Sequence, residues 1–192
     1  MNLKQIPIAS IKSSKFKNIP NDIFSLLQDG VWLAGGATRS FITGEIPSDF
    51  DMFFKTQELA DKSKQVLESK GYIKTFQCPI GSLTTYKLND IKVQVITPRF
   101  YKSINELVDS FDFTTTLAGI DNKYLYINKQ FIKDTKKKVL RIHRLTYPVA
   151  TINRAYKYKG KGYSIIDCLR DILERVNLHD PDIVDLSTYY ID

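Results

Sequence analysis

The sequence predicts an α+β (mixed α/β) fold, in which a sheet has helices to one side and is followed by a helical C-terminal part. The order of the expected elements indicates this class, because stretches with helical periodicity alternate with short apolar runs typical of strands. From about Pro148 the pattern is helical to the end. With 192 residues and 43% hydrophobic composition, the chain suffices for one domain with a core, alone or with a small helical appendage.

Helices and strands alternate in the first part of the chain. After an irregular N-terminus, a helix is expected to begin at Pro20 and Asn21, with Asn21 as its cap, and to end at Gly30. The next expected elements are a short buried strand ending in a turn (31–36), a short helix (37–43) closed by Gly44, a strand (50–54), and a helix (56–70) with Gly71 as its C-cap.

Strands dominate the middle of the chain. Asn89 and Asp90 form a hairpin signal between two of them, and Ser103 and Glu106 have the spacing of a capping box. The expected elements are strands at 72–78, 82–88 and 91–97, a helix at 103–111, a strand at 123–128, and helices from Pro148 onward with a break at 160–162.

The composition is typical of a protein in a reducing compartment. No apolar run reaches the length of a membrane span, and the N-terminus lacks the apolar core of a secretory signal. Cys78 and Cys168 fall in different elements without metal-ligand companions, so we expect both to be ordinary apolar side chains. These points predict a cytoplasmic protein with no membrane partner.

Positive charge is concentrated in residues 129–161. The whole chain carries a net charge of +7, but this segment holds eleven Lys or Arg against the single acid Asp134. Tyrosines are interleaved with these cations, which suits contact with a polyanion such as a nucleic acid. A solvated helix face that aids solubility is the alternative. The interleaved tyrosines are Tyr147, Tyr156, Tyr158 and Tyr163.

Two aspartates lie inside a run of phenylalanines. Asp49 and Asp51 are two residues apart on an expected strand, so their side chains point to the same face. Two adjacent carboxylates repel each other unless a cation bridges them or one is protonated. Oxygen ligands of this kind suit Mg²⁺ (or Mn²⁺), completed by substrate phosphates. The alternative places Asp49 at a loop end and Asp51 on a solvated edge.

A glycine pair precedes the aspartates. Gly35 and Gly36 lie between an expected strand and helix, where the backbone can approach phosphates and point N–H groups at them. Arg39 follows one helical turn later and is placed for a charge-assisted contact with a triphosphate. The turn, the cation and the candidate metal ligands therefore fall in one short unit.

That unit resembles the head-domain signature of tRNA nucleotidyltransferases (CCA-adding enzymes) and bacterial poly(A) polymerases. The family pattern is G-G-x-x-R-D, two apolar positions, G, two free positions, P, one free position, and D-x-D. Every spacing is kept here, and Ser40 replaces the usual Asp. The matching residues are Gly35, Gly36, Arg39, Ile42, Gly44, Pro47, Asp49 and Asp51.

Weaker similarities follow in the order of the family, so the resemblance spans about residues 20–165. Residues 93–99 are similar to a family strand, with Gln94 where a carboxylate is usual. Asp112 begins a stretch that looks like the motif around the nucleotide's sugar. Arg154 and Lys157 match a helix that the resemblance places near the triphosphate. The E-D-x-x-R motif of CCA-adding enzymes is absent, which favours a reduced, single-head nucleotidyltransferase.

The resemblance implies a nucleotidyltransferase fold, a small, mixed and mostly antiparallel sheet. It implies a head domain over 1–145 and a short, neck-like helical segment over 146–192. The implied reaction transfers a nucleoside monophosphate from a nucleoside triphosphate to a hydroxyl acceptor such as an RNA 3′ end, with Asp49 and Asp51 as catalytic metal ligands and pyrophosphate as product. RNA would contact segment 129–161, and the oligomeric state is open.

Two other functions stay open at this point. Gln94 and the missing arginines before Asp112 favour a degenerate member that binds nucleotide or nucleic acid without catalysis. A structural or partner-binding protein, with the basic segment as its docking face, is the third hypothesis.

Overall fold

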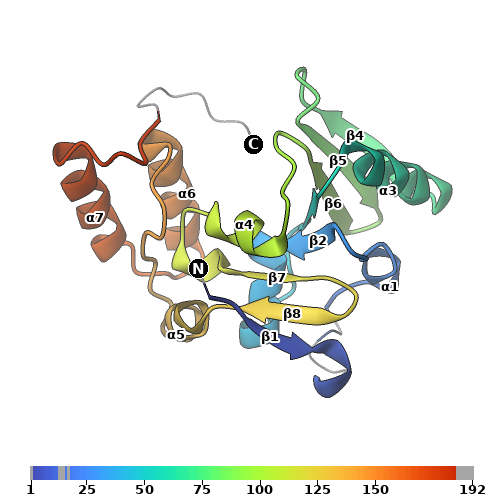
Figure 1. Ribbon diagram of the computed structural model, residues 1–192, viewed down its shortest axis with the longest axis horizontal. Helices are drawn as coiled ribbons and strands as arrows, with labels where there is room; N and C mark the ends of the chain where they lie inside the picture. Colours follow the sequence, from blue (N-terminus) through green and yellow to red (C-terminus); the bar gives the residue numbers. More distant parts are fainter. Residues whose placement is uncertain (1, 13–15, 17, 185–192) are drawn as a thin grey trace.

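A mixed sheet organises the chain in the computed structural model, which describes residues 2–12, 16 and 18–184 (Figure 1). Within that part, the strand order is β1-β8-β7-β2-β3-β6-β5-β4. β3 and β6 pair in parallel, and all the other neighbours are antiparallel. The strands are β1 (Lys4–Pro7), β2 (Val31–Ala34), β3 (Phe50–Phe54), β4 (Ile73–Gln77), β5 (Leu83–Leu88), β6 (Ile91–Ile96), β7 (Ala118–Ile120) and β8 (Tyr124–Ile127). The α+β class with a mostly antiparallel sheet is therefore confirmed.

Seven α-helices accompany the sheet in the described residues. Two 3₁₀ turns matter for the site, η3 (Gly35–Arg39) and η4 (Thr114–Thr116). The helices are α1 (Asn21–Phe24), α2 (Ser40–Thr43), α3 (Gln57–Ser69), α4 (Ile104–Asp109), α5 (Lys129–Lys137), α6 (Pro148–Gly160) and α7 (Ile166–Asn177).

Helices cover both faces of the sheet, so the expectation of helices on one side only is wrong. Phe53 points toward α4, where its ring packs edge-on against that of Phe111. The strand register puts Tyr86 on the opposite face, and its hydroxyl donates to Glu68 of α3 at 2.9 Å. Gly119 of β7 allows α4 to approach closely, since a Cβ there would lie 2.8 Å from Ile104 Cδ1.

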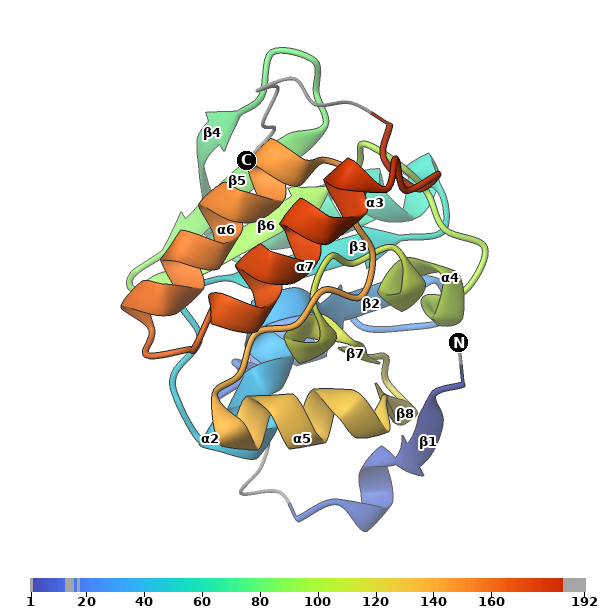
Figure 2. The ribbon, with the colours of Figure 1, turned by 90° about the vertical axis from the view of Figure 1, so that its left-hand side faces the viewer.

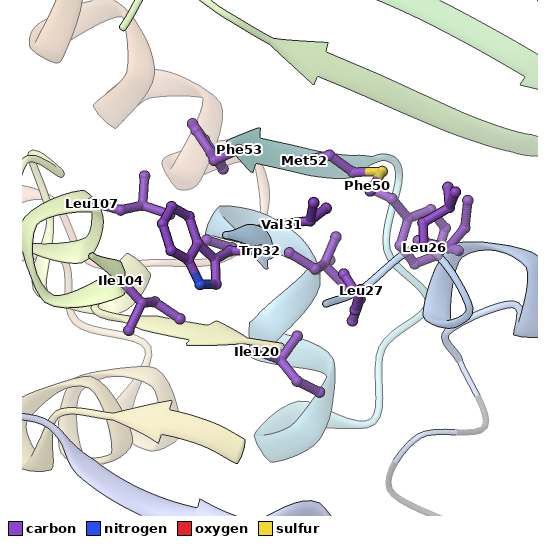
Figure 3. Packing of buried hydrophobic residues seen from close by; sticks show 14 of the residues in the cluster. Leu26, Leu27, Val31, Trp32, Phe50, Met52, Phe53, Ile104, Leu107 and Ile120 are labelled. Atoms are coloured by element: carbon purple, nitrogen blue, oxygen red, sulfur yellow. The ribbon is translucent and has the colours of Figure 1, made fainter. Parts of the chain in front are cut away.

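The core lies between the sheet and these helices (Figure 3). Trp32 and Phe53 are opposed on β2 and β3, and Figure 3 shows Trp32 beside Ile104 and Leu107 of α4. Both strands are buried along almost their whole length, which their nearly continuous apolar sequences predict. Asp51 is the exception within β3, so the polar site begins at the edge of this core.

α6 and α7 lie side by side across the sheet (Figure 2). They pack on a second apolar cluster that includes Phe113, Leu140 and Leu145 from the preceding segments. Gly162, with φ of 80°, ends α6 at the break expected for 160–162. The division at residue 145 stays a prediction, and residues 185–192 of the expected C-terminal segment lie outside the described residues. No helix in the described ranges is long and apolar enough to cross a bilayer.

Several element boundaries differ from expectation. α1 ends at Phe24 rather than near Gly30, and Asn21 is its first residue instead of its cap, because Pro20 occupies that position without a side-chain bond. β1, β7 and α5 form where no regular element was expected. The chain was expected to be helical to its end, but α7 ends at Asn177 and residues 178–184 are not helical. The remaining expected strands and helices are present, and the hairpin between β5 and β6 turns at Asn89, with φ of 51°.

Candidate active site

Asp49 and Asp51 flank Phe50 at the start of β3. Phe50 is 4% exposed and points into the core, so the alternation of β3 turns the Asp51 carboxylate to the other face. Asp49 lies in the loop directly before β3, and its Oδ2 is 3.6 Å from Lys92 Nζ. Both aspartates are half-buried, and both act electrostatically on Lys161. The expectation that Asp49 is a strand residue is wrong, because β3 begins at Phe50 and Asp49 is at the end of the preceding loop, while Asp51 lies within β3 between β2 and β6.

Gly35 makes room for the Asp51 carboxylate. The glycine has φ of 69°, a conformation that L side chains rarely adopt, and it begins η3 directly after β2. A Cβ at this position would lie 2.9 Å from Asp51 Oδ2. The glycine turn and the carboxylate pair, predicted as one unit from the sequence, are thus in direct contact.

Arg39 points from η3 toward α6. It is 8% exposed, its Nη1 donates to the Tyr158 hydroxyl at 2.5 Å, and its guanidinium carbon lies 4.8 Å from the centre of the Tyr158 ring. Burial raises the pKa of Tyr158, against the lowering effect of the Arg39 charge, so the phenol stays neutral and can accept the bond. Tyr158 thereby fixes the direction of the guanidinium.

A cavity of about 310 Å³ opens beside the glycine turn. Gly36 and Arg39 line it from η3, Ser48 from the loop before β3, and Lys161 from the end of α6. Partial desolvation of the otherwise exposed side chain is the main cause that lowers the pKa of Lys161, followed by repulsion from Arg39, while Asp49 and Asp51 act in the opposite direction. Two cations, with Glu45 as the one acid in the lining, thus surround a space near the two aspartates, an arrangement that suits a polyphosphate.

A second cavity, of about 270 Å³, lies on the other side of Asp49. Asp51 is directly opposite Gln94 in the parallel pairing of β3 with β6. Lys92 Nζ is 3.6 Å from Asp49 Oδ2, and Lys157 of α6 lines the same cavity. The neutral amide therefore occupies the position next to the carboxylate pair where the family pattern has a third acid.

Asp112 and Arg154, both predicted to contact nucleotide, are bonded to each other. Arg154 Nη1 donates to Asp112 Oδ2, and the Thr151 hydroxyl donates to the same oxygen at 3.0 Å. Asp112 is 9% exposed, so this ion pair ties α6 to the segment before η4. A nucleotide contact by either residue stays a prediction.

The donor set fits a divalent cation that also binds substrate phosphate. Asp49 and Asp51 supply carboxylate oxygens, and the missing Cβ of Gly35 leaves space beside Asp51. Among the residues that the structure describes, no group of three or more His, Cys, Asp or Glu could form a closed metal cage. Mg²⁺ or Mn²⁺ held by two carboxylates and completed by phosphates and water is consistent with this set.

Sequence reasoning missed four residues that the fold brings to the site. Tyr158 and Lys161 were counted only as members of the basic segment, and Lys92 and Thr151 were not singled out. The glycines on both sides of Lys161 were a usable signal, because they end α6 at this position. Lys92 gave no local signal, since its nearness to Asp49 arises from strand pairing.

The comparison with protein families identifies one match. The model described as Gad2, Gabija anti-defense 2 family protein, matches residues 9–138. A curated relative from Bacillus phage SPbetaL7, named Gabija anti-defense 2, is 24% identical over 137 residues, covering 69% of this chain and 34% of the relative. The chain thus spans about a third of the length of that relative.

Solved structures of CCA-adding enzymes share the fold. A complex of such an enzyme with ATP has a TM-score of 0.64 at 14% identity, covering 93% of this chain and 47% of the other. The Thermotoga maritima CCA-adding enzyme with tRNA has a TM-score of 0.62 at 15% identity, with the same two coverages of 93% and 47%. The chain therefore has a nucleotidyltransferase fold, and the resemblance to the tRNA nucleotidyltransferase head holds at that level.

Proposed function

The chain belongs to the Gabija anti-defense 2 family, and from this premise we propose that it counteracts the Gabija defense as a metal-dependent nucleotidyltransferase. The reaction is transfer of a nucleoside monophosphate from a nucleoside triphosphate to a hydroxyl acceptor. The observation that carries the proposal is the Asp51 carboxylate against the Gly35 turn, with Asp49 just before the same strand and Arg39 and Lys161 around the adjacent cavity.

The proposed step is a displacement at the α-phosphorus. The acceptor hydroxyl oxygen bonds to this phosphorus, the bond to the bridging oxygen of the β-phosphate breaks, and pyrophosphate leaves. A bound divalent cation would stabilise the charge on the phosphates. Asp49 and Asp51 would provide its protein ligands, Arg39 and Lys161 neutralise the triphosphate, and an Asp49 oxygen receives the hydroxyl proton before it passes to water.

The proposed acceptor is an RNA 3′ end. Of the eleven Lys and Arg in segment 129–161, all but Arg144 and Arg154 are exposed. Tyr147 and Tyr156 are exposed beside them, and Lys159 Nζ lies 5.9 Å from the centre of the Tyr156 ring. Cations with exposed aromatic rings suit single-stranded nucleic acid, whose bases stack on such rings. The nucleotide contacts expected for Asp112, Arg154 and Lys157 belong to the same proposal.

A second candidate is a nucleotide-binding protein without catalysis. The position of Gln94 directly opposite Asp51 favours it, since an amide supplies no negative charge to a metal. The ion pair of Lys92 with Asp49 favours it as well. Such a protein would act in the anti-defense pathway by sequestering nucleotide, RNA or a protein.

The test is nucleotide transfer with matched variants. The protein is incubated with Mg²⁺ or Mn²⁺, labelled triphosphates and total RNA, and transfer of label is measured. We expect Asp51→Asn and Asp49→Asn to reduce transfer by roughly a hundredfold or more, the scale on which a lost electrostatic group acts. Asp61→Asn is the control, because Asp61 is exposed on α3, on the opposite face of the sheet.

The outcomes separate the two candidates. Full activity in Asp51→Asn would exclude the proposed site. Triphosphate binding without transfer under either metal supports the second candidate. In that case, transfer that appears in Gln94→Glu identifies the missing carboxylate as the cause.

A further inference from the structure

The cavity beside Asp49 is separate from the cavity at the glycine turn. Ser48 lines the glycine-turn cavity and Asp49, the next residue, lines the other. The carboxylate pair thus lies between Lys161 on one side and Lys92 with Gln94 on the other. In an in-line displacement the attacking and leaving groups lie on opposite sides of the transferred phosphorus. If the glycine-turn cavity holds the triphosphate, the cavity beside Asp49 is on the side of the attacking group.

The wall of this second cavity combines charge with apolar surface. Lys92, Gln94 and Ile96 follow each other at every second position of β6, so they share one face. Leu83 is paired with Ile96 on the neighbouring strand and extends that face. Lys157 lines the cavity from α6. The ammonium groups of Lys92 and Lys157 therefore line the cavity together with the apolar side chains of Leu83 and Ile96.

We propose that this cavity binds a phosphorylated nucleoside unit, the terminal nucleotide of the acceptor. Lys92 and Lys157 contact its phosphate, Gln94 bonds to its sugar or base, and Leu83 and Ile96 pack on its apolar surface. A volume of about 270 Å³ accommodates one such unit. This inference rests on the proposed function, because it names the acceptor's binding site for that reaction, and it makes Lys92 an acceptor-binding residue.

Direct binding tests the proposal without requiring transfer. AMP, CMP, GMP and UMP are titrated against the whole chain by calorimetry, with the unphosphorylated nucleosides as comparison. At least one monophosphate should bind about tenfold more tightly than its nucleoside, the effect of one charge-assisted contact. Binding should persist when a non-hydrolysable triphosphate and Mg²⁺ are present at saturation. Loss of monophosphate binding under saturating triphosphate would overturn the proposal, because both ligands would then share one cavity.

Matched variants locate the contact. Lys92→Met should weaken monophosphate binding about tenfold. Lys87→Met is the control, since Lys87 is opposite Lys92 on β5 and exposed but does not line the cavity. Equal effects of the Lys92 and Lys87 variants would overturn the assignment.

Binding of a short oligoribonucleotide with the same terminal nucleotide shows whether the acceptor is RNA or a free nucleotide. Tighter binding of the oligonucleotide assigns the acceptor to RNA, and equal binding assigns it to free nucleotide. Simultaneous binding of monophosphate and triphosphate without transfer leaves this site standing and rejects the proposed function. If transfer occurs and Lys92→Met leaves the KM for the acceptor unchanged, the proposed function stands and this acceptor site is rejected.

Discussion

Gly35 is the residue on which the geometry of the Asp51 carboxylate depends most directly. We predict that Gly35→Ala reduces nucleotide transfer more than tenfold. The added Cβ meets Asp51 Oδ2 at 2.9 Å, so the carboxylate must move, and φ of 69° is strained for alanine. The expected loss in free energy of unfolding is about 1–3 kcal/mol. Transfer assays and chemical denaturation measure the two effects separately.

Gly71→Ala is the control for this variant. Gly71 also has a positive φ, 86°, but nothing lies within 4 Å of the Cβ that alanine would add. Its variant should lose similar stability and keep full transfer. If both variants lose activity alike, general strain rather than contact with Asp51 is the cause.

Single residues also show how far the sequence predicts the site. Gly35, Gly36, Asp49 and Asp51 were found because their spacing is local, and a turn between two paired strands preserves it. Lys92 lies beside Asp49 only because β6 pairs in parallel with β3, after about forty intervening residues that include α3. Spacing along a chain carries no information about such a pairing, so this part of the site required the fold.

At the scale of elements, α6 is attached to the site through the Arg39 and Tyr158 contact. We predict that Tyr158→Phe lowers the free energy of unfolding by about 1–3 kcal/mol, because buried Arg39 loses the hydroxyl that accepts its bond. The ring face remains, so α6 should still pack. The KM for triphosphate should rise, since the guanidinium is no longer held at the glycine-turn cavity. Denaturation and steady-state kinetics check the two effects.

Tyr163→Phe is the control for Tyr158→Phe. Tyr163 packs edge-on against Tyr158 with ring centres 5.2 Å apart, and its buried hydroxyl has no hydrogen-bond partner within the described ranges. Removing that hydroxyl should leave stability unchanged or slightly raised. A loss in Tyr163→Phe as large as in Tyr158→Phe would contradict the role given to the Arg39 bond.

Element prediction succeeded where periodicity and end signals agreed. α3 has an apolar stripe, Thr56 as its N-cap and Gly71 just beyond its end, and it was predicted almost to the residue. α5 was missed because its inward face includes Asp134 and Thr135. Asp134 is 1% exposed and is satisfied by Thr114 and Gln130, so its burial depends on partners that periodicity cannot anticipate. β7, with three residues, forms only because β2 and β8 pair with it on either side.

At the scale of the whole molecule, buried tyrosines couple folding to pH. Burial raises the pKa of Tyr86, Tyr126 and Tyr158 above the ordinary value of 10, with hydrogen bonds to carboxylates adding to the effect for Tyr86 and Tyr126. Below pH 10, folded and unfolded chains both keep these phenols neutral. Above pH 10, the unfolded chain releases their protons while the folded chain retains them, so the unfolded state gains stability as pH rises.

We therefore predict that stability begins to fall near pH 9, where the Cys168 thiol ionises only in the unfolded chain because burial raises its pKa in the fold to about 12, and falls more steeply above pH 10. Each tyrosine that stays protonated in the folded state contributes a slope of up to about 1.4 kcal/mol per pH unit. The lowered pKa of Lys161 acts in the opposite direction, because its unfavourable charge is relieved as pH approaches 10.5. It is one group against five tyrosines and Cys168, whose pKa values are all raised. Urea denaturation at pH 8, 10 and 11 measures the slope.

Tyr86→Phe tests the origin of that slope. Tyr86 is 1% exposed and its hydroxyl donates to Glu68, so the variant should cost about 1 kcal/mol at pH 8. Above pH 10 the free energy of unfolding of this variant should fall less steeply than that of the wild type, by about the slope that one tyrosine contributes. The plots of stability against pH for the two proteins should therefore converge. Tyr147→Phe, at a position that is 42% exposed, should leave the slope unchanged. Parallel curves for Tyr86→Phe and the wild type would mean that the alkaline loss comes from other groups, such as the cations of segment 129–161.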